Sequence, residues 1–248
     1  MRTFLTVLLL AAALPAGSAE ITLIAPGGIR DAIQRMLPGF EKATGHTVKA
    51  TFGSGGGTKK QVMQGEHYDV PIVQPPLAAV TATGHVVAST ETPLAVVPVA
   101  LAVRKGAPKP DIATPDAVRK TLLAAASVSF PDGSRGAAAG VSFENTLRSL
   151  GIAAEMEPRL KRVQGGANAM KVLAQGEVEI GLTFASEIHE PGVDVVGLLP
   201  REISTPTALV GYVSAHSAAP AAARALLDYL SSPAVAGIYR ELGMVPGK

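Results

Sequence analysis

The segment His46-Thr-Val-Lys-Ala-Thr-Phe-Gly-Ser-Gly-Gly-Gly-Thr-Lys-Lys-Gln-Val-Met-Gln64 carries the clearest sign of a fold class in this chain. Residues 46–52 alternate polar with apolar side chains, which predicts a β-strand. The glycine loop 53–57 follows without a break, and residues 58–64 predict a helix. A strand that leads through a short loop into a helix is the unit of an α/β fold, in which right-handed crossovers join parallel strands.

The same unit precedes this segment. Residues 20–25 form a short apolar strand that the Pro-Gly-Gly sequence at 26–28 interrupts. Apolar residues then recur at three- and four-residue spacing over 29–40, which predicts a helix that stops by Gly45. Pro38 inside this pattern predicts a kink or an early end of the helix.

The pattern resumes later in the chain. The apolar run Leu94–Val103 predicts one long strand, and Lys105–Pro110 is typical of a surface linker. Further strands are predicted over Tyr68–Val73, Ser127–Phe130, Glu157–Val163, Glu179–Phe184 and Thr207–Ser214, and further helices over Val141–Leu150, Ala167–Gln175, Ala221–Leu230 and Ala234–Leu242.

The order of these elements predicts two lobes. The two terminal helices most simply pack back on the first lobe, which makes that lobe discontinuous. We expect a first lobe of residues 20–96 plus 203–248 and a second lobe of residues 97–202, joined by a two-strand hinge. Each lobe is expected to be α/β, with a mixed, mostly parallel sheet flanked by helices.

The amino terminus has the layout of a secretory signal peptide. Arg2 gives a positive start, residues 4–14 form an apolar run, and small residues lead up to Ala19. A membrane-spanning helix needs about 20 apolar residues, which this run does not reach. We expect residues 1–19 to be cleaved and the rest to be exported to the periplasm without stable membrane insertion.

Composition excludes several classes of function. The formal net charge is +2 and the basic residues are scattered, so nucleic acid is not an expected partner. The chain has no cysteine, and its five histidines lack the short spacings of a metal site, so no metal or cofactor is expected. A serine-hydrolase motif is missing as well. Aromatic residues make up 4% of the chain, which argues against a sugar-stacking site.

Three loops stand where a predicted strand ends and a helix begins, at residues 26–30, 53–59 and 133–142. Ligands of open α/β sheets bind at the carboxyl ends of strands. Helix amino termini there carry unpaired N–H groups and partial positive charge, and glycines let the backbone approach a ligand. Together the loops predict an anion site. Taken alone, the glycine loop could equally be a flexible turn beside two solvated lysines.

Charged residues near these loops extend the prediction. Arg30 lies in the first turn of its helix, where a cation opposes the helix dipole, so either an anionic ligand or solvent faces it. Arg135 is a candidate cation from the second lobe. Glu187 follows a predicted strand and could accept a ligand hydroxyl, act as a base or pair with a lysine.

Several stretches are similar to the molybdate-binding type of periplasmic solute-binding protein. This family has the type 2 two-lobed, hinged α/β fold, so the resemblance implies a monomer that delivers a small anion to an ABC importer in the membrane. The stretches that carry the resemblance are Ile21–Ala32, Phe40–His46, Thr51–Gly57, Tyr68–Val70, Lys109–Asp116, Leu122–Ala125, Ala139–Gly140, Gly176–Gly181 and Ala225–Ala234.

The resemblance also implies which residues form the site. The family holds its oxyanion with serine hydroxyls from the first two loops and a tyrosine from the second lobe. These positions correspond to Gly28, Gly55 and Phe184, which predicts a divergent subgroup and favours an organic carboxylate over molybdate. The expected ligand-binding residues are Gly28, Ile29, Arg30, Ser54, Gly55, Gly56, Thr58, Lys59, Ser134, Arg135, Ala139, Gly140, Gly166 and Phe184.

Three alternatives stay open at this point. Some relatives resemble an aconitate isomerase, which moves an allylic proton of a tricarboxylate, and Lys59 and Glu187 are the candidate catalytic residues for such a reaction. The chain could instead bind molybdate or tungstate. A purely structural exported protein is the third alternative, and it gives the three glycine loops no purpose.

Overall fold

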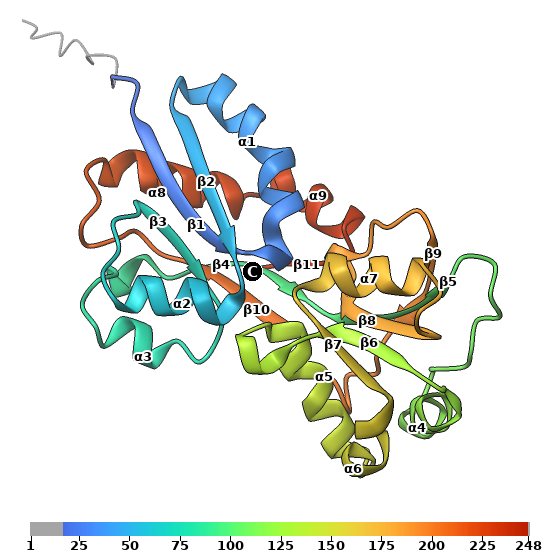
Figure 1. Cartoon of the computed structure of the whole chain (residues 1–248). Helices are drawn as coiled ribbons and strands as arrows, with labels where there is room; N and C mark the ends of the chain where they lie inside the picture. The colour runs from blue at the N-terminus through green and yellow to red at the C-terminus, as the bar shows by residue number, and fades with distance from the viewer. Residues whose placement is uncertain (1–16, 248) are drawn as a thin grey trace, which may run out of the picture.

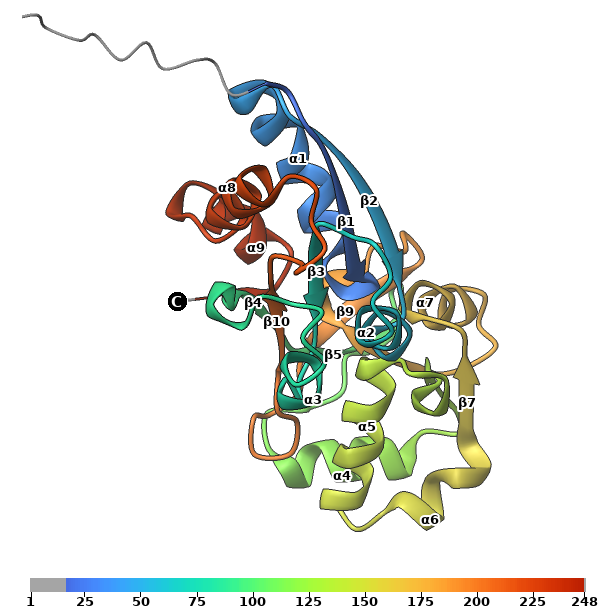
Figure 2. The same ribbon diagram turned by 90° about the vertical axis from the view of Figure 1, so that its left-hand side faces the viewer.

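The computed structural model describes residues 17–247, so most of the predicted signal peptide lies outside the described residues. Two α/β lobes stand side by side, each built on its own mixed sheet (Figures 1 and 2). This confirms the predicted fold class. No helix among residues 17–247 is long and apolar enough to cross a membrane.

The first lobe is built on a six-stranded sheet with the order β11-β4-β10-β3-β1-β2. β1 pairs in parallel with β2 and β3, whereas β10 runs antiparallel to β3 and β4, and β11 antiparallel to β4. Its strands are β1 (Glu20–Pro26), β2 (Thr47–Gly53), β3 (Val70–Val73), β4 (Thr92–Val97), β10 (Thr207–Gly211) and β11 (Val245–Pro246).

The second lobe is built on a five-stranded sheet with the order β7-β6-β8-β5-β9. β6 pairs in parallel with β7 and β8, and β5 pairs antiparallel with β8 and β9. Parallel pairs do not outnumber antiparallel ones in either sheet, so the sheets are mixed but less parallel than predicted. The strands are β5 (Val99–Arg104), β6 (Val128–Pro131), β7 (Leu160–Val163), β8 (Ile180–Phe184) and β9 (Val193–Leu198), of which β9 was not predicted.

The connection between the sheets differs from the prediction at one point. The apolar run Leu94–Val103 is not one strand, because it divides at Pro98 into β4 of one sheet and β5 of the other. Proline has no N–H to continue a strand ladder, which accounts for the division. The chain returns between Leu198 and Thr207. The exact lobe boundaries stay a prediction.

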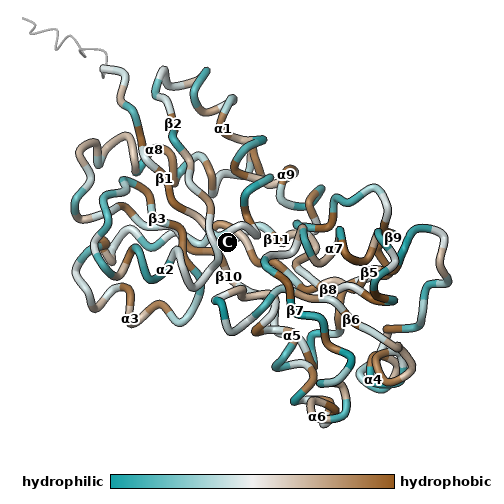
Figure 3. The backbone as a smooth tube through the Cα atoms, in the orientation of Figure 1, coloured by the Kyte–Doolittle hydropathy of each residue, from teal (hydrophilic) through white to brown (hydrophobic). Residues whose placement is uncertain are grey.

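Helices cover both sheets. α8 and α9 pack against α1, as predicted for the terminal helices. The helices are α1 (Arg30–Thr44), α2 (Gly55–Met63), α3 (Ala78–Thr81), α4 (Pro115–Ala124), α5 (Ala138–Ser149), α6 (Ala153–Met156), α7 (Gly166–Ala174), α8 (Pro220–Leu230) and α9 (Ala236–Glu241). Apolar residues concentrate along the strands of both sheets (Figure 3).

Two helix ends correct the sequence-based expectation. α1 does not end early at Pro38 but continues to Thr44, where Gly45 adopts a left-handed φ of 74°. Burial of its apolar face, including Ile33 and Phe40, outweighs the missing proline N–H. α2 begins inside the glycine loop at Gly55 rather than after it, because the preceding serine caps the helix amino terminus.

Candidate ligand site between the lobes

A cavity of about 810 Å³ lies between the two lobes and is lined by both. Three helices begin at its wall: α2 with Gly55, α5 with Ala138, and α7 with Gly166. The amino terminus of a helix carries unpaired N–H groups and partial positive charge. The convergence of three such termini favours an anionic ligand.

The glycine loop contributes fewer free amides than its sequence suggests. The N–H of Gly57 donates to the Ser54 Oγ at 3.1 Å, which is the cap that starts α2. The N–H of Gly56 donates across the cleft to the Gly136 carbonyl oxygen at 2.9 Å. Part of the glycine loop therefore joins the two lobes and does not offer its amides to the cavity.

Two guanidinium groups line the cavity, one from each lobe. Arg30 comes from the first turn of α1, and its guanidinium carbon lies 5.3 Å from the centroid of the Phe52 ring. Arg135 comes from the loop after β6. Both side chains are exposed, so they can adjust to a ligand. Each can hold a carboxylate through two parallel hydrogen bonds.

Lys59 does not line the cavity. Its Nζ donates to the Pro76 carbonyl oxygen at 3.3 Å, and partial burial lowers its pKa. Its backbone lies in the second turn of α2, which begins at Gly55. As described, the structure does not bring Lys59 to the predicted site.

Carboxyl groups also reach the cavity wall, so the wall is not uniformly basic. The Asp31 Oδ2 lies 2.7 Å from the His189 Nε2, a contact between the lobes. Asp132 accepts hydrogen bonds from the Ser134 side chain and backbone, which hold its pKa below the usual range. Glu190 is a third acidic neighbour. Hydrogen-bond donors already engage the first two of these groups.

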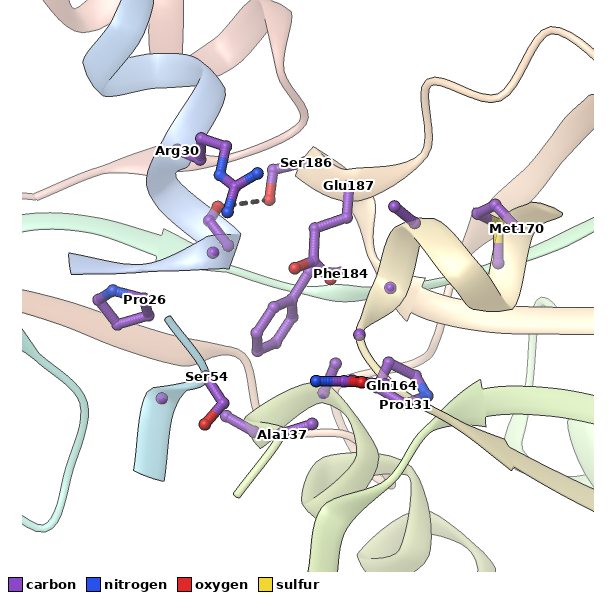
Figure 4. Close-up of a pocket in the computed structure, with 18 of the residues that line it drawn as sticks. Pro26, Arg30, Ser54, Pro131, Ala137, Gln164, Met170, Phe184, Ser186 and Glu187 are labelled. Carbon is purple, nitrogen blue, oxygen red and sulfur yellow. Dashed lines mark hydrogen bonds between the residues drawn. The ribbon is translucent and has the colours of Figure 1, made fainter. Parts of the chain in front are cut away.

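The Glu187 carboxyl is part of the cavity wall and is largely desolvated. Its carboxylate accepts a hydrogen bond from the Thr183 hydroxyl and lies at the start of α7, where a Cβ on Gly166 would come within 2.3 Å of the Glu187 Oε2. Burial raises the pKa of the Glu187 carboxyl, and the Thr183 hydrogen bond and the charge of Arg30 oppose that shift only in part. Figure 4 shows Glu187, Phe184 and Gln164 facing the same space.

Close contacts surround Gly28 and Gly55, the two positions that the resemblance to the molybdate-binding family predicts to correspond to its serines. A Cβ on Gly28 would lie 2.9 Å from the Phe184 Cδ2 of the opposite lobe. A Cβ on Gly55 would lie 1.9 Å from the Gln74 Oε1. Real Cβ atoms do not approach so closely, so a serine at either position requires its neighbour to move.

The structure brings together part of the predicted set. Those that line the cavity are Gly28, Arg30, Ser54, Gly55, Arg135, Ala139, Gly166, Phe184 and Glu187, and those that do not are Ile29, Gly56, Thr58, Lys59, Ser134 and Gly140.

The residues outside the cavity have structural contacts instead. Ile29 belongs to the core, and the Thr58 hydroxyl is buried without a hydrogen-bond partner among the described residues. Gly140 packs on the backbone, since a Cβ there would lie 1.9 Å from the Pro131 carbonyl oxygen. Whether any residue of the wall binds ligand stays a prediction.

Two glutamines of the cavity wall were missed. Gln74 directly follows β3, so its position at the carboxyl end of a strand was a usable signal. It is 4% exposed, and its side chain lies in front of Gly55. Gln164 precedes α7 and points into the cavity (Figure 4). Its role depends on the path of a loop, for which the sequence offers no local signal.

Two α/β lobes with a cavity between them, at the starts of several helices, are typical of a protein that binds a solute. The family model described as "Bacterial extracellular solute-binding protein" matches residues 21–245. The chain belongs to this family, and it is similar in sequence and fold to molybdate-binding, type 2 proteins.

Individual relatives agree with this assignment. The "Aconitate isomerase" of a Pseudomonas species is 33% identical over 240 residues, covering 91% of this chain and 87% of that protein. The "Molybdate-binding protein ModA" of Rhodobacter capsulatus is 26% identical over 241 residues, covering 96% and 93%. The solved periplasmic molybdate-binding protein of Azotobacter vinelandii has a TM-score of 0.76 at 17% identity, covering 92% and 100%.

Proposed function

We propose that this solute-binding protein binds a small organic anion with two or more carboxylates in the periplasm and delivers it to an ABC importer. The observation that carries the proposal is the pair Arg30 and Arg135, which reach one cavity from opposite lobes. A ligand with two carboxylates can engage both guanidinium groups at once. Its binding then favours the closed arrangement of the lobes.

The proposal prefers carboxylates to molybdate for a steric reason. A compact oxyanion is held by a cage of neutral donors, and side chains at Gly28 and Gly55 are blocked by Phe184 and Gln74. The cavity of about 810 Å³ also exceeds what a tetrahedral oxyanion fills. Molybdate or tungstate binding is the outcome that would contradict this reasoning.

A thermal-shift panel tests the proposal. Citrate, cis-aconitate, trans-aconitate and smaller dicarboxylates are compared with molybdate, tungstate and sulfate. A ligand at 100 times its Kd adds about 2.7 kcal/mol to the free energy of unfolding, which is readily detected as a rise in melting temperature. We expect a shift with one or more polycarboxylates. A shift with molybdate alone would refute the carboxylate assignment.

A second candidate function is isomerisation of a tricarboxylate. Glu187 favours it, because this carboxyl faces the cavity and burial raises its pKa, which makes it a stronger base once ionised. The relative at 33% identity named aconitate isomerase supports the same reaction. In this reaction Glu187 would take a proton from the allylic methylene carbon, the double bond would shift by one position, and the proton would return to the former vinylic carbon.

Proton exchange distinguishes an enzyme from a carrier. The protein is incubated with cis- or trans-aconitate in heavy water, and NMR follows deuterium at the methylene carbon and the appearance of the other isomer. For an enzyme we expect exchange in the parent protein and a loss of about 100-fold or more in Glu187→Gln. Glu190→Gln, a matched change in the same wall, should retain the rate. Tight binding without exchange would identify a carrier.

A further inference from the structure

Three of the five histidines meet on the first lobe, away from the cavity. His67 lies before β3, His85 follows α3, and His216 follows β10. The His85 Nδ1 lies 2.9 Å from the His216 Nε2, and the ring centroids of His67 and His216 are 5.8 Å apart. Because these residues come from three separate loops, their spacing in the sequence does not predict the cluster.

We propose that His85 and His216 bind a divalent copper or nickel ion. Imidazole is a preferred ligand of these metals, and both accept square-planar or tetragonal nitrogen and oxygen ligands. Two nitrogens at about 2.05 Å from a metal, at right angles, are about 2.9 Å apart. That is the separation of the two ring nitrogens here, which now face each other in a hydrogen bond. For metal binding both rings must turn so that their lone pairs point at the metal, and the ring that donates the hydrogen bond must carry its proton on its other nitrogen instead.

The backbone fixes the two histidines relative to each other. Val86 and Ser214 form an antiparallel bridge, and the N–H of Ala215 donates to the His85 carbonyl oxygen at 2.9 Å. The His85 ring also lies against Gly65, where a Cβ would come within 2.8 Å of the ring. A pair held in this way loses little conformational entropy when a metal binds.

Water and the neighbouring His67 are the remaining ligands in this proposal. Within residues 17–247 no group of three or more histidine, cysteine or acidic residues is already arranged around a metal position. The nearby Asp69 is not a ligand, because its carboxylate accepts hydrogen bonds from Thr22, Ser217 and Ala218. His67 stands edge-on to His216 and can reach the metal only by rotating its side chain.

Calorimetric titration of the untagged full chain with NiCl2 near pH 7.5 tests the proposal. We expect one ion per chain, and at least a tenfold loss of affinity in His85→Ala and in His216→Ala. His46→Ala and His189→Ala are matched controls that should retain the affinity, since these residues lie elsewhere. Wild-type affinity in His216→Ala, or the main loss in His189→Ala, would overturn the proposal.

Electron paramagnetic resonance with Cu²⁺ gives a second readout. Coupling to at least two nitrogens is expected in the parent chain and should disappear in the double variant of His85 and His216. An unchanged spectrum in a double variant with native circular dichroism would also overturn the proposal. Carboxylate binding should be unaffected by these changes, so this test and the thermal-shift panel can fail independently.

Discussion

The two lobes contribute different things to the cavity. Around Gly27 and Gly28 the first lobe offers backbone to the cavity, with Arg30 as its cation. The second lobe offers the side chains of Phe184 and Glu187, which lie over these two glycines: a Cβ on Gly28 would meet the Phe184 ring at 2.9 Å, and one on Gly27 would lie 3.5 Å from the Glu187 Oε1. The absence of side chains at these glycines thus leaves room for the side chains of the opposite lobe.

Two polar contacts that join the lobes also use the backbone of the first lobe, in addition to the side-chain contact between Asp31 and His189. The Ser186 hydroxyl donates to the Gly28 carbonyl oxygen at 2.6 Å, and the Gly56 N–H donates to the Gly136 carbonyl oxygen at 2.9 Å. Backbone groups of the first lobe take part in both. In the proposed closure over a ligand, affinity depends on how near these two surfaces can come.

The largest expected effect comes from separating the lobes. Gly56→Val would place side-chain atoms against Gly136, where even a Cβ would lie 2.9 Å from the Gly136 Cα. Because neither backbone can yield cheaply, we expect a loss of ligand affinity of more than about 150-fold. Isothermal titration measures the affinity, and small-angle scattering measures closure. Gly237→Ala is the control, since a Cβ there meets nothing within 4 Å. Undiminished closure in Gly56→Val would show that the contact is unimportant.

The next effect compares the cations of the two lobes. Hydrogen bonds to charged groups contribute about 1.5–3 kcal/mol, so Arg30→Ala and Arg135→Ala should each weaken carboxylate binding by roughly 10- to 150-fold. Arg→Lys at either position should recover only part of the affinity, because the bidentate geometry is lost. Titration with the best polycarboxylate of the thermal-shift panel measures both. Full affinity in Arg30→Ala would remove that residue from the site.

A smaller effect concerns the pairing of Gly28 with Phe184. Gly28→Ser alone should lower affinity about tenfold, because the new side chain collides with the ring. Phe184→Ala relieves the collision, so the double variant should bind better than the sum of the single effects predicts. A double-mutant cycle measures the coupling, and strict additivity would contradict the contact.

The fold was easier to predict from the sequence than the site was. Strand alternation and glycine breaks are local signals, and they predicted the α/β class and the return of α8 and α9 to the first lobe. The division at Pro98 was missed because apolar residues run through it on both sides. The signal was the proline itself, whose missing N–H ends the strand.

The site depends on contacts between distant segments. Arg30, Arg135 and Glu187 were predicted as site residues because each follows a strand end, and all three line the cavity. Lys59 was predicted with them from its place beside the glycine loop, but it lies within α2, which begins at Gly55, and does not line the cavity. Gln74 and the link between Gly56 and Gly136 require knowledge of which loops face each other.

The smallest expected effect is a pH dependence of the free energy of unfolding, which arises from Glu187 in the second lobe. Burial raises the pKa of Glu187, so the folded protein binds its proton more tightly than the unfolded chain does. The stability that this proton contributes is complete below the ordinary glutamate pKa and is lost as pH rises through the higher pKa of the folded state. One proton changes the free energy of unfolding by at most about 1.4 kcal/mol per pH unit.

Denaturant melts at several pH values measure this effect. Over the interval between the two pKa values, the free energy of unfolding should fall more steeply with pH in the parent chain than in Glu187→Gln. Arg30→Gln should extend the decline to higher pH, because the guanidinium favours the ionised carboxylate and its removal raises the pKa of Glu187 further. Parallel profiles for the parent and Glu187→Gln would mean that the carboxyl is not desolvated between the lobes, and the catalytic candidate would lose its physical basis.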